Sequence, residues 1–456
     1  MRIRSRNHVF TYSRNQRTRS KSAFRLAIIH RLNFLIVTIG SHGDVHPFVG
    51  IAAALKRRGH DVTLMTNGHF ESLVRRESID FVGFGSSEDY LAMTKNKDLW
   101  SKRRGFKVVF GSVCETLQKV YEPIAEHIRA NPDTILIGSS LALAARIAQD
   151  QFGVPMMTVH LAPAIFRSSI SPPRLPGLFM PFWLPISIKN KLWEGGDRFV
   201  IDPVLAPALN TFRATLGLPP VARVLWEWWN SPQLIVGLFP DWFAKPQSDW
   251  PRQVKLTGFP LYDERGHESL PREVEDFLKA GDKPIAFTPG SAMVHGREFF
   301  VAATNACIKL NRRGILLTRF GEQIPAALPS NVIHAEYAPF SELLPRTAAL
   351  VHHGGIGTTS QALAAGIPQL IAPMSHDQFD NATRVTRLGV GDEIGRFRAG
   401  AVARKLDRLL SDPEIASACR ATKLRFDAVD GIELTCDLAE SLANNHPRVA
   451  AAVATK

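Results

Sequence analysis

Residues 350–373, LVHHGGIGTTSQALAAGIPQLIAP, combine the groups that hold a phosphate. Glycines between a buried strand and a helix let the backbone approach an anion, and the first N–H groups of the helix attract it. The loop glycines are Gly354, Gly355 and Gly357. Thr358 and Thr359 follow at the helix start, where a hydroxyl caps the helix or reaches a phosphate oxygen, and His353 can donate a hydrogen bond to it. The segment therefore predicts a phosphate or diphosphate site.

A second loop of the same kind lies earlier in the chain. The segment KPIAFTPGSA predicts a strand that ends in a turn with Gly290 and Ser291. A glycine and a small hydroxyl residue at a strand end again expose backbone N–H groups to an anion. This loop is interpreted as a second phosphate contact.

Two common nucleotide-binding patterns are disfavoured. A P-loop needs GxxxxGK[ST], and no lysine follows these glycines. A dinucleotide-binding fold needs GxGxxG and an acidic residue at the end of the second strand. The first candidate loop, GSHGD, has only Gly40 and Gly43, and the next strand ends at Thr66 and Asn67 without a carboxylate. An NAD-dependent oxidoreductase is therefore a distant alternative.

The elements that position these loops alternate between strands and helices, as in doubly wound α/β domains. NFLIVTIG predicts a strand, and PFVGIAAALKRRG predicts a helix with Pro47 in its first turn and Gly59 after its end. HDVTLMT predicts the next strand, and the same order returns in DTILIGSSLALAARIAQDQFGVPMMTVH. A second region with this order begins at KPIAFTPGSA and includes the histidine segment.

These patterns predict two α/β domains. An N-terminal domain covers residues 32–235, and a C-terminal domain covers residues 262–430. Residues 236–261 are rich in proline and turn residues and are interpreted as a linker, while residues 431–456 are interpreted as a C-terminal helix and tail. Residues 1–31 hold nine Lys or Arg and no acidic residue, and we expect a disordered basic extension there.

Composition narrows the class of protein. The chain has 456 residues, of which 45% are hydrophobic and 21% charged, as in globular proteins that bury a large core. The basic extension accounts for most of the net charge of +13, so the folded part needs no nucleic acid as a partner. The four cysteines have no CxxC spacing, which fits a reducing compartment. The longest apolar run, residues 175–188, is too short for a membrane span and contains prolines, so we expect a cytoplasmic protein.

Residues 161–230 depart from the alternating pattern. The segments PPRLPGLFMPFWLP and VLWEWWN concentrate proline, phenylalanine and tryptophan. One interpretation is an irregular insertion that packs on the domain. The other is the wall of an apolar pocket, or a patch that contacts a membrane surface. The sequence leaves both open.

Three motifs together resemble those of nucleotide-sugar-dependent glycosyltransferases of the family 1 type. They are HHGGIGTTSQALAAGIPQ…HDQFDN, GSHGDVHPFVGIAAALKRRGHDVTLMT and TGFPLYD. The similarity covers residues 33–445 and is greatest to the bacterial branch that acts on lipids, sterols and natural products, including the rhamnosyltransferases of rhamnolipid synthesis. It implies the GT-B fold, in which two Rossmann-like domains face each other across a cleft. The donor then lies on the C-terminal domain and the acceptor on the N-terminal domain.

The resemblance also implies roles for single residues on the donor side. His353, Thr358 and Ser291 match positions that contact the donor phosphates, beside Gly355, Gly357 and Thr359. Asp377 and Gln378 match a pair that binds the hydroxyls of the donor sugar, and His376 beside them is interpreted as part of the site. Tyr337 to Phe340 match the loop around the base. The stacking tryptophan of the plant branch is absent near Tyr337, and Gln361 replaces that branch's ribose-binding glutamate.

The catalytic base is assigned through the motif GDVHP. Asp44 occupies the place of the histidine that acts as base in plant members, and a carboxylate near an apolar pocket can have a raised pKa and accept a proton. His42 and His46 are neighbours that could substitute for it or orient it. The competing interpretation of Asp44 is a helix cap, because it precedes Pro47.

The resulting prediction is an inverting, metal-independent glycosyltransferase that moves a hexose from a UDP- or dTDP-sugar to a hydroxyl of an apolar small molecule or lipid. It needs no cofactor besides the nucleotide sugar as co-substrate. The expected partners are this donor and an apolar hydroxylated acceptor, with a membrane surface as a further contact. Alternatives are a nucleotide-sugar epimerase of similar fold and a catalytically silent nucleotide-sugar or lipid-binding protein.

Overall fold

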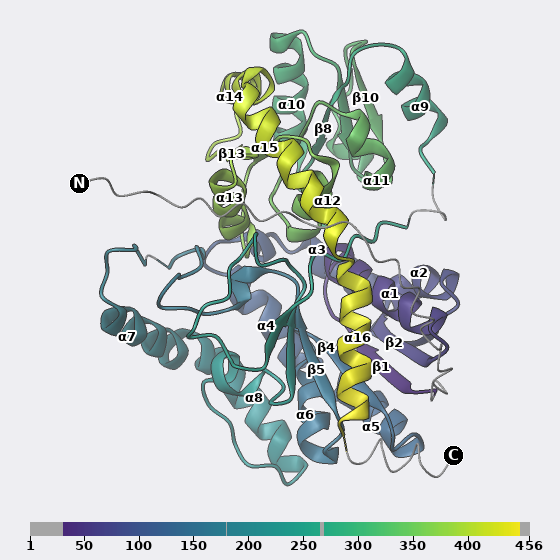
Figure 1. The fold of residues 1–456 in the computed structure, drawn as a ribbon, viewed down its shortest axis with the longest axis vertical. Helices are drawn as coiled ribbons and strands as arrows, with labels where there is room; N and C mark the ends of the chain where they lie inside the picture. The colour runs from purple at the N-terminus through teal and green to yellow at the C-terminus, as the bar shows by residue number, and fades with distance from the viewer. Residues whose placement is uncertain (1–30, 179, 265–268, 447–456) are drawn as a thin grey trace, which may run out of the picture. The chain divides into compact units, whose positions relative to one another are not determined.

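The structure is a computed structural model that describes residues 31–178, 180–264 and 269–446. The basic extension predicted for residues 1–31 lies outside this part of the chain except for Arg31, and so do the last ten residues of the predicted C-terminal tail. The predicted pair of doubly wound α/β domains is confirmed, because the described residues form two separate sheets with parallel strands only (Figure 1).

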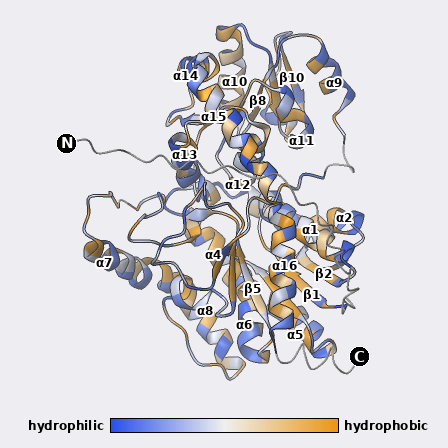
Figure 2. Ribbon diagram, in the orientation of Figure 1, coloured by the Kyte–Doolittle hydropathy of each residue, from blue (hydrophilic) through white to orange (hydrophobic). Residues whose placement is uncertain are grey.

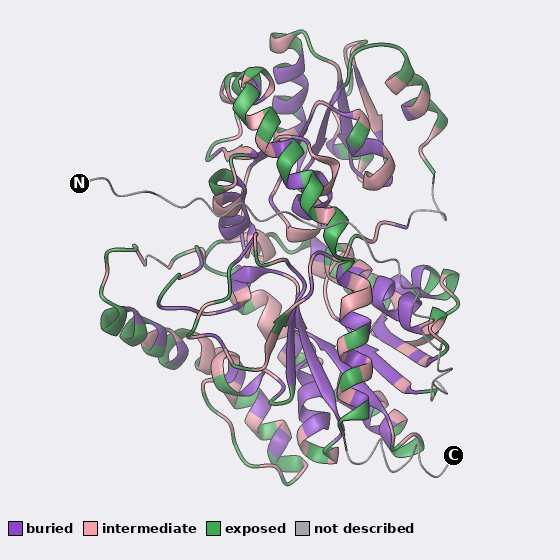
Figure 3. Cartoon of the chain, viewed as in Figure 1, coloured by how far each residue is buried: buried purple, intermediate pink, exposed green. Residues whose placement is uncertain are grey.

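The first sheet has seven strands in the order β3-β2-β1-β4-β5-β6-β7. Their bounds are β1 Asn33–Val37, β2 Asp61–Asn67, β3 Asp80–Phe84, β4 Ile135–Ser139, β5 Met156–His160, β6 Leu234–Gly237 and β7 Val254–Leu256. Every residue of β4 and β5 is buried, as expected for parallel strands covered on both faces (Figure 3). Hydrophobic residues are concentrated in these central strands (Figure 2).

Helices cover both faces of this sheet. Alternate residues of β1 point to opposite faces, so Phe34 and Ile36 belong to one core cluster and Leu35 and Val37 to another. The helices are α1 His42–Arg57, α2 Glu71–Arg76, α3 Ser87–Lys95, α4 Gly105–Glu115, α5 Leu117–Ala130, α6 Leu143–Phe152, α7 Ile186–Gly196 and α8 Asp202–Thr215. α1 and α2 pack on the Phe34 face, whereas α5, α6 and α8 pack on the Leu35 face.

The second sheet has six strands in the order β10-β9-β8-β11-β12-β13. Their bounds are β8 Ile285–Thr288, β9 Gly314–Leu317, β10 Val332–Ala335, β11 Ala349–His352, β12 Gln369–Ile371 and β13 Gly391–Glu393. The helices around it are α9 Arg272–Lys279, α10 Arg297–Leu310, α11 Phe340–Leu343, α12 Ile356–Ala365, α13 Gln378–Arg387, α14 Ala399–Ser411 and α15 Pro413–Lys423. α10 and α14 cover one face and α11 and α12 the other, so this domain also has three layers.

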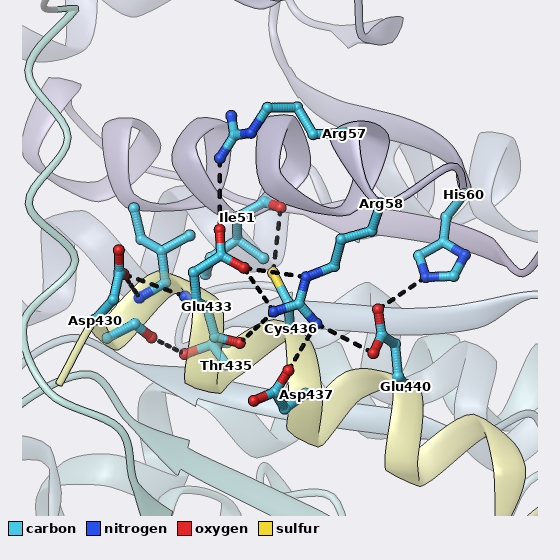
Figure 4. Close-up of polar contacts among 12 residues, drawn as sticks. Ile51, Arg57, Arg58, His60, Asp430, Glu433, Thr435, Cys436, Asp437 and Glu440 are labelled. Atoms are coloured by element: carbon cyan, nitrogen blue, oxygen red, sulfur yellow. Dashed lines mark hydrogen bonds and ion pairs between the residues drawn. The ribbon is translucent and has the colours of Figure 1, made fainter. Parts of the chain in front are cut away.

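The last helix, α16 (Gly431–Asn444), completes the core of the first domain although it follows the second in sequence. Its buried residues Cys436, Ala439 and Ala443 join the cluster on the α1 face. Figure 4 shows the polar contacts along this seam, where Arg58 donates to Glu433 at 2.6 Å and to Asp437 at 2.7 Å. The helix predicted at the C-terminal end of the chain is therefore a part of the N-terminal domain.

Replacing Arg58 by Met is expected to lower the free energy of unfolding by about 1–3 kcal/mol, because its charged hydrogen bonds to Glu433 and Asp437 and its ion pair with Glu440 are lost. Urea unfolding measures this change. Arg57→Met is the matched control, since Arg57 is exposed and its contact with Glu433 is longer, at 3.6 Å. This change should lower the free energy of unfolding by less than about 0.5 kcal/mol. Equal effects of the two changes would contradict a specific role of Arg58.

The chain crosses between the domains twice, and the two crossings touch. Thr257 and Thr435 are joined by a hydrogen bond of 2.9 Å between their hydroxyls. Phe259 stacks on Phe426, with ring centroids 5.9 Å apart. A Cβ atom on Gly431 would lie only 2.7 Å from the carbonyl carbon of Gly258, so glycine is required where the two segments meet.

Two boundaries differ from the prediction. The segment 236–261, predicted as a linker, contains the end of β6 and all of β7, so the first sheet continues to Leu256. The proline-rich composition indicated a loop because β7 has only three residues. The first helix begins at His42 rather than at Pro47, because Ser41 and Asp44 cap it one turn earlier.

Candidate active site

A cleft of about 1460 Å³ is lined by residues that follow the carboxyl ends of strands in both sheets. In open α/β sheets this edge is where ligands bind, because the helices that follow the strands present their N-termini there. From the first domain the lining includes the loops after β1 and β4. From the second it includes the loops after β8, β11 and β12. All the predicted site residues line the cleft except Thr359.

The two histidines that end β11 have different environments. His352 is fully buried, where its Nδ1 accepts a hydrogen bond from the backbone N–H of Gly354 at 3.1 Å and its Nε2 lies 2.9 Å from Oε1 of Gln369. Because Nδ1 accepts, Nε2 carries the proton and donates it to Gln369. His352 therefore holds the loop in shape, and His353 is the histidine that lines the cleft.

The ring of His353 lies between two glycines. A Cβ atom on Gly290 would be 2.8 Å from its Cε1, and a Cβ on Gly355 would be 2.5 Å from its Nε2. Burial lowers the pKa of His353 to about 4, so the ring is neutral at pH 7 and one nitrogen donates a hydrogen bond. Its Nδ1 is buried and has no hydrogen-bond partner among the described residues. Because His353 lines the cleft, we expect its ring to donate a hydrogen bond to a ligand there.

The N-terminus of α12 adds backbone N–H groups to this part of the cleft. Gly355 is its N-cap, and Gly355, Gly357 and Thr358 line the cleft, so the first N–H groups of the helix face the ligand space. Ser291 and Gly290, after β8, line the same region. Thr359 differs: it is fully buried and its hydroxyl has no hydrogen-bond partner among the residues described. Its side chain belongs to the packing of α12 and does not face the cleft.

The loop after β12 carries His376, Asp377 and Gln378. The Oε1 of Gln378 accepts from the backbone N–H groups of Met374 and Ser375, at 2.8 and 3.1 Å, which fixes the loop. Its Nε2 has no partner within the described part of the chain and is left for a ligand. The Nε2 of His376 donates to the backbone carbonyl of Leu99 at 3.1 Å, so this histidine joins the two sides of the cleft.

Asp377 accepts a hydrogen bond of 2.7 Å from Asn381. Its pKa is raised to about 7, chiefly by burial and further by the negative charge of Asp44, while the bond from Asn381 opposes the rise. Asp44 and Asp377 come from different domains and line the same cleft, so a negative charge on Asp44 disfavours ionisation of Asp377.

We expect Asp377→Asn to make the fold more stable relative to the natural chain as pH rises from about 4 to 8. The folded pKa near 7 lies above the unfolded value of 3.8, so ionisation of the carboxyl costs stability progressively in this window and costs none below it. Asparagine can still accept the bond from Asn381. Melting temperatures measured at several pH values test this, and a difference between the two proteins that stays constant with pH would contradict it.

Asp44 lies in the third position of α1 and faces the cleft. Its Oδ2 accepts from the backbone N–H and the hydroxyl of Ser41, at 2.8 and 2.9 Å, which caps the helix. Its Oδ1 accepts no hydrogen bond from any described residue. Burial raises the pKa of Asp44 although the two bonds from Ser41 lower it. Capping thus uses one oxygen and leaves the other, on a carboxylate with raised proton affinity, for the ligand.

His42 and His46 surround Asp44 but are held by other groups. The Nε2 of His42 accepts from the guanidinium of Arg319 at 3.1 Å, and burial is the main cause that lowers its pKa to about 3. The Nε2 of His46 lies 3.2 Å from Oε1 of Glu264. These contacts favour an orienting role for both histidines over direct proton abstraction.

Arg319 is a cleft residue that the sequence did not indicate. It follows β9, contacts His42 across the cleft and lies over the ring of Tyr337, 5.3 Å from its centroid. The hydroxyl of Tyr337 donates to the backbone carbonyl of Asp263 at 2.8 Å, and Phe340 lines the cleft beside it. An arginine after a strand is common on protein surfaces, so only the three-dimensional contact distinguishes this one.

The N-terminal side of the cleft has a mainly apolar wall. The insertion at residues 161–230 contributes to it, so the pocket-wall interpretation fits its position. The apolar side chains that line this side include Ile39, Phe106, Val109, Phe110, Leu141, Leu161, Ile165, Leu175, Leu178, Leu192, Trp193, Val200 and Trp229. None of the described helices has both the length and the apolar character needed to cross a bilayer.

Models of two known domains match the chain. The glycosyltransferase family 28 N-terminal domain matches residues 34–169, and the C-terminal domain of the erythromycin biosynthesis protein CIII-like family matches residues 315–430. The first match contains Asp44, and the second contains the glycine loop with His353 and the pair Asp377 and Gln378.

Two proteins of known name are similar along most of this chain. An O-mycaminosyltylonolide 6-deoxyallosyltransferase of Streptomyces fradiae is 29% identical over 444 residues, covering 90% of this chain and 98% of that protein. A sterol 3-beta-glucosyltransferase of Pichia angusta is 26% identical over 421 residues, covering 88% of this chain and 33% of that protein. The chain therefore spans about a third of the yeast protein's length.

Solved structures agree on the fold. The glycotransferase of kitacinnamycin superposes with a TM-score of 0.70 at 20% identity and covers 91% of this chain and 99% of that one. The spinosyn rhamnosyltransferase SpnG complexed with thymidine diphosphate has a TM-score of 0.64 at 18% identity and covers 89% of this chain and 100% of that one. The predicted GT-B fold is confirmed, and the domain models and the named relatives agree that the chain is a glycosyltransferase similar to those of the family 1 type.

Proposed function

We propose that this glycosyltransferase moves a hexose from a UDP- or dTDP-sugar to a hydroxyl of an apolar acceptor, with inversion at the anomeric carbon. The observation that supports this most is that one cleft combines a carboxylate with a free oxygen on one side and a glycine-flanked histidine at a helix N-terminus on the other. The first group suits an acceptor hydroxyl and the second a diphosphate.

In this mechanism Asp44 accepts the proton of the acceptor hydroxyl through Oδ1. The oxygen attacks the anomeric carbon of the donor from the side opposite the nucleoside diphosphate, a carbon–oxygen bond forms, and the bond to the diphosphate breaks. Asp377 and Gln378 hold the hydroxyls of the sugar. Negative charge that develops on the leaving diphosphate is stabilised by the first N–H groups of α12 and by His353. In this mechanism no metal ion is needed to stabilise the negative charge of the diphosphate.

The apolar wall and the relatives support the proposed acceptor class. One relative is named for a macrolide glycosylation and another for a sterol glycosylation, and both kinds of acceptor are large, apolar and hydroxylated. The cleft volume and its apolar wall can hold such a molecule together with a nucleotide sugar. A thymidine diphosphate complex among the structural neighbours supports dTDP as one donor nucleotide.

An epimerase of similar fold is the weaker candidate. An epimerase acts on the nucleotide sugar alone, so it has no use for an extended apolar wall opposite the phosphate site. This wall and the free oxygen of Asp44 favour transfer to an acceptor.

We also propose a cytoplasmic enzyme that contacts the inner face of a membrane through the insertion. Phe182, Trp183 and Phe199 are 91%, 65% and 72% exposed, and Leu192 and Val200 in the same segment reach the cleft. Such a surface would let an apolar acceptor pass from lipid into the cleft. Sedimentation with phosphatidylglycerol vesicles tests it: equal binding by the natural chain and a Phe182→Ser, Trp183→Ser variant would contradict it.

The proposed transfer is tested by offering UDP- and dTDP-glucose and dTDP-rhamnose with a sterol or a macrolide lactone, detecting the product by mass and determining its anomeric configuration by NMR. Thermal shifts with UDP, dTDP and GDP identify the nucleotide independently of the acceptor. A glycosylated product with inverted anomeric configuration is expected. Retention of configuration, or nucleotide-sugar isomerisation without transfer, would contradict the proposal.

A further inference from the structure

Three polar side chains form a line of hydrogen bonds in the first domain. Ser140 follows β4, His160 ends β5, and Asn230 precedes β6. The Oγ of Ser140 lies 2.8 Å from Nδ1 of His160, and Nε2 of His160 lies 2.8 Å from Oδ1 of Asn230. The mechanism described above uses none of them.

The direction of the hydrogen bonds in this line is fixed by Asn230. Its Oδ1 can only accept, so Nε2 of His160 carries the proton and Nδ1 is a lone pair. His160 is 1% exposed, and burial lowers its pKa to about 4, which keeps the ring neutral. The hydroxyl of Ser140 therefore donates to Nδ1, and its oxygen lone pairs remain unused by this line.

The surroundings hold Asn230 in place. Its backbone carbonyl accepts from Nε of Arg146 at 3.2 Å. The next residue, Ser231, donates its backbone N–H to the hydroxyl of Thr158 at 2.9 Å and its own hydroxyl to the carbonyl of Met156 at 2.7 Å. The segment that carries Asn230 is thus hydrogen-bonded to β5. The ring of His160 cannot turn without breaking its hydrogen bonds to Ser140 and Asn230.

Ser140 lines the cleft, while His160 lies behind it. Leu141, Leu161 and Trp229, which are adjacent in sequence to Ser140, His160 and Asn230, also line the cleft. β4 pairs directly with β1, with Gly138 opposite Val37, so Ser140 lies one strand away from the loop that leads to Asp44. The hydroxyl of Ser140 donates its proton to His160, so toward the cleft its oxygen can only accept a hydrogen bond. This oxygen lies beside the region proposed for the acceptor substrate.

We propose that Ser140 binds a second hydroxyl or an N–H group of the acceptor, and that His160 and Asn230 are positioning residues that keep the Ser140 oxygen free to accept. This inference rests on the proposed function and specifies its substrate class. The acceptor substrate therefore carries two groups that donate hydrogen bonds, one to Asp44 and one to Ser140. A molecule with an ether or carbonyl oxygen at the second place is disfavoured, because two hydrogen-bond acceptors would face each other.

The test measures binding of a polyhydroxylated macrolide lactone and of its derivatives that each carry one methylated hydroxyl, by calorimetry in the presence of dTDP. The natural chain is expected to bind the free lactone about 2- to 10-fold more tightly than one of the derivatives, the range for a neutral hydrogen bond. Ser140→Ala should bind the free lactone and this derivative equally. Ser140→Thr, which keeps the hydroxyl, should retain the preference for the free lactone.

His160→Gln tests the positioning role. Glutamine can donate to or accept from Ser140, so the preference for a hydroxyl should weaken while affinity for dTDP stays unchanged. The inference is overturned if the natural chain shows no preference, if it binds no form of the lactone, or if Ser140→Ala keeps the preference. Transfer is assayed separately with the same lactone, so binding with the expected preference but without product would contradict the proposed function and leave the Ser140 site supported.

Discussion

Asp44→Asn is expected to reduce turnover by about 10²- to 10⁴-fold, because loss of a general base typically costs this much. Asparagine keeps the shape of the side chain, and its oxygen can still accept from the N–H and hydroxyl of Ser41, so the start of α1 should persist. Donor affinity should change little, because the phosphate loop lies on the other domain. Turnover, donor affinity and melting temperature are measured on the same protein.

The histidines beside Asp44 provide the comparison for this variant. His42→Gln and His46→Gln should reduce turnover less, because His42 is bonded to Arg319 and His46 lies beside Glu264. Near-normal turnover of Asp44→Asn would transfer the role of base to one of these histidines. Loss of turnover together with a large fall in melting temperature would show that Asp44 acts as a cap only.

His353→Ala is expected to weaken binding of UDP or dTDP by about 10- to 100-fold. A hydrogen bond to a charged group contributes about 1.5–3 kcal/mol, and every 1.4 kcal/mol changes affinity tenfold. Loss of the ring should affect the fold little, since it packs on two glycines and its buried Nδ1 lacks a hydrogen-bond partner among the described residues. The measurement is the nucleotide-induced rise in melting temperature, which reflects about 2.7 kcal/mol at 100 times the dissociation constant.

His295→Ala is the matched control for this experiment. His295 is an exposed histidine of the same domain that does not line the cleft, so its loss should leave the nucleotide effect intact. If His353→Ala keeps full nucleotide affinity, the assignment of the phosphate site is wrong.

Local sequence patterns predicted which loops of the C-terminal domain line the cleft, because the relevant residues are contiguous in sequence. The glycines, His353 and Thr358 lie within a few residues, and their order along a strand and a helix already places them together. Thr359 shows the limit of this reasoning: it has the same residue type as Thr358, but the turn of the helix directs it into the core.

Residues that meet only through the fold were not predictable from one sequence. Ser140 and Asn230 are 90 positions apart and meet through His160, and Arg319 contacts His42 over a separation of 277 residues. The packing of α16 on the first domain was not predictable for the same reason, since its apolar face at Cys436 and Ala439 would suit the core of either domain. Such pairings depend on tertiary packing, which no local period encodes.

The contact between the two crossings determines how the enzyme would respond to a cut in its backbone. Cleavage between Thr257 and Phe259 would give one fragment with the first sheet and another with the second sheet and α16. The first fragment would lack a part of its own core, because Cys436, Ala439 and Ala443 belong to the other piece. The two pieces should therefore stay associated as a complex of complementary fragments, and the chain could be expressed in two parts that reassemble through α16.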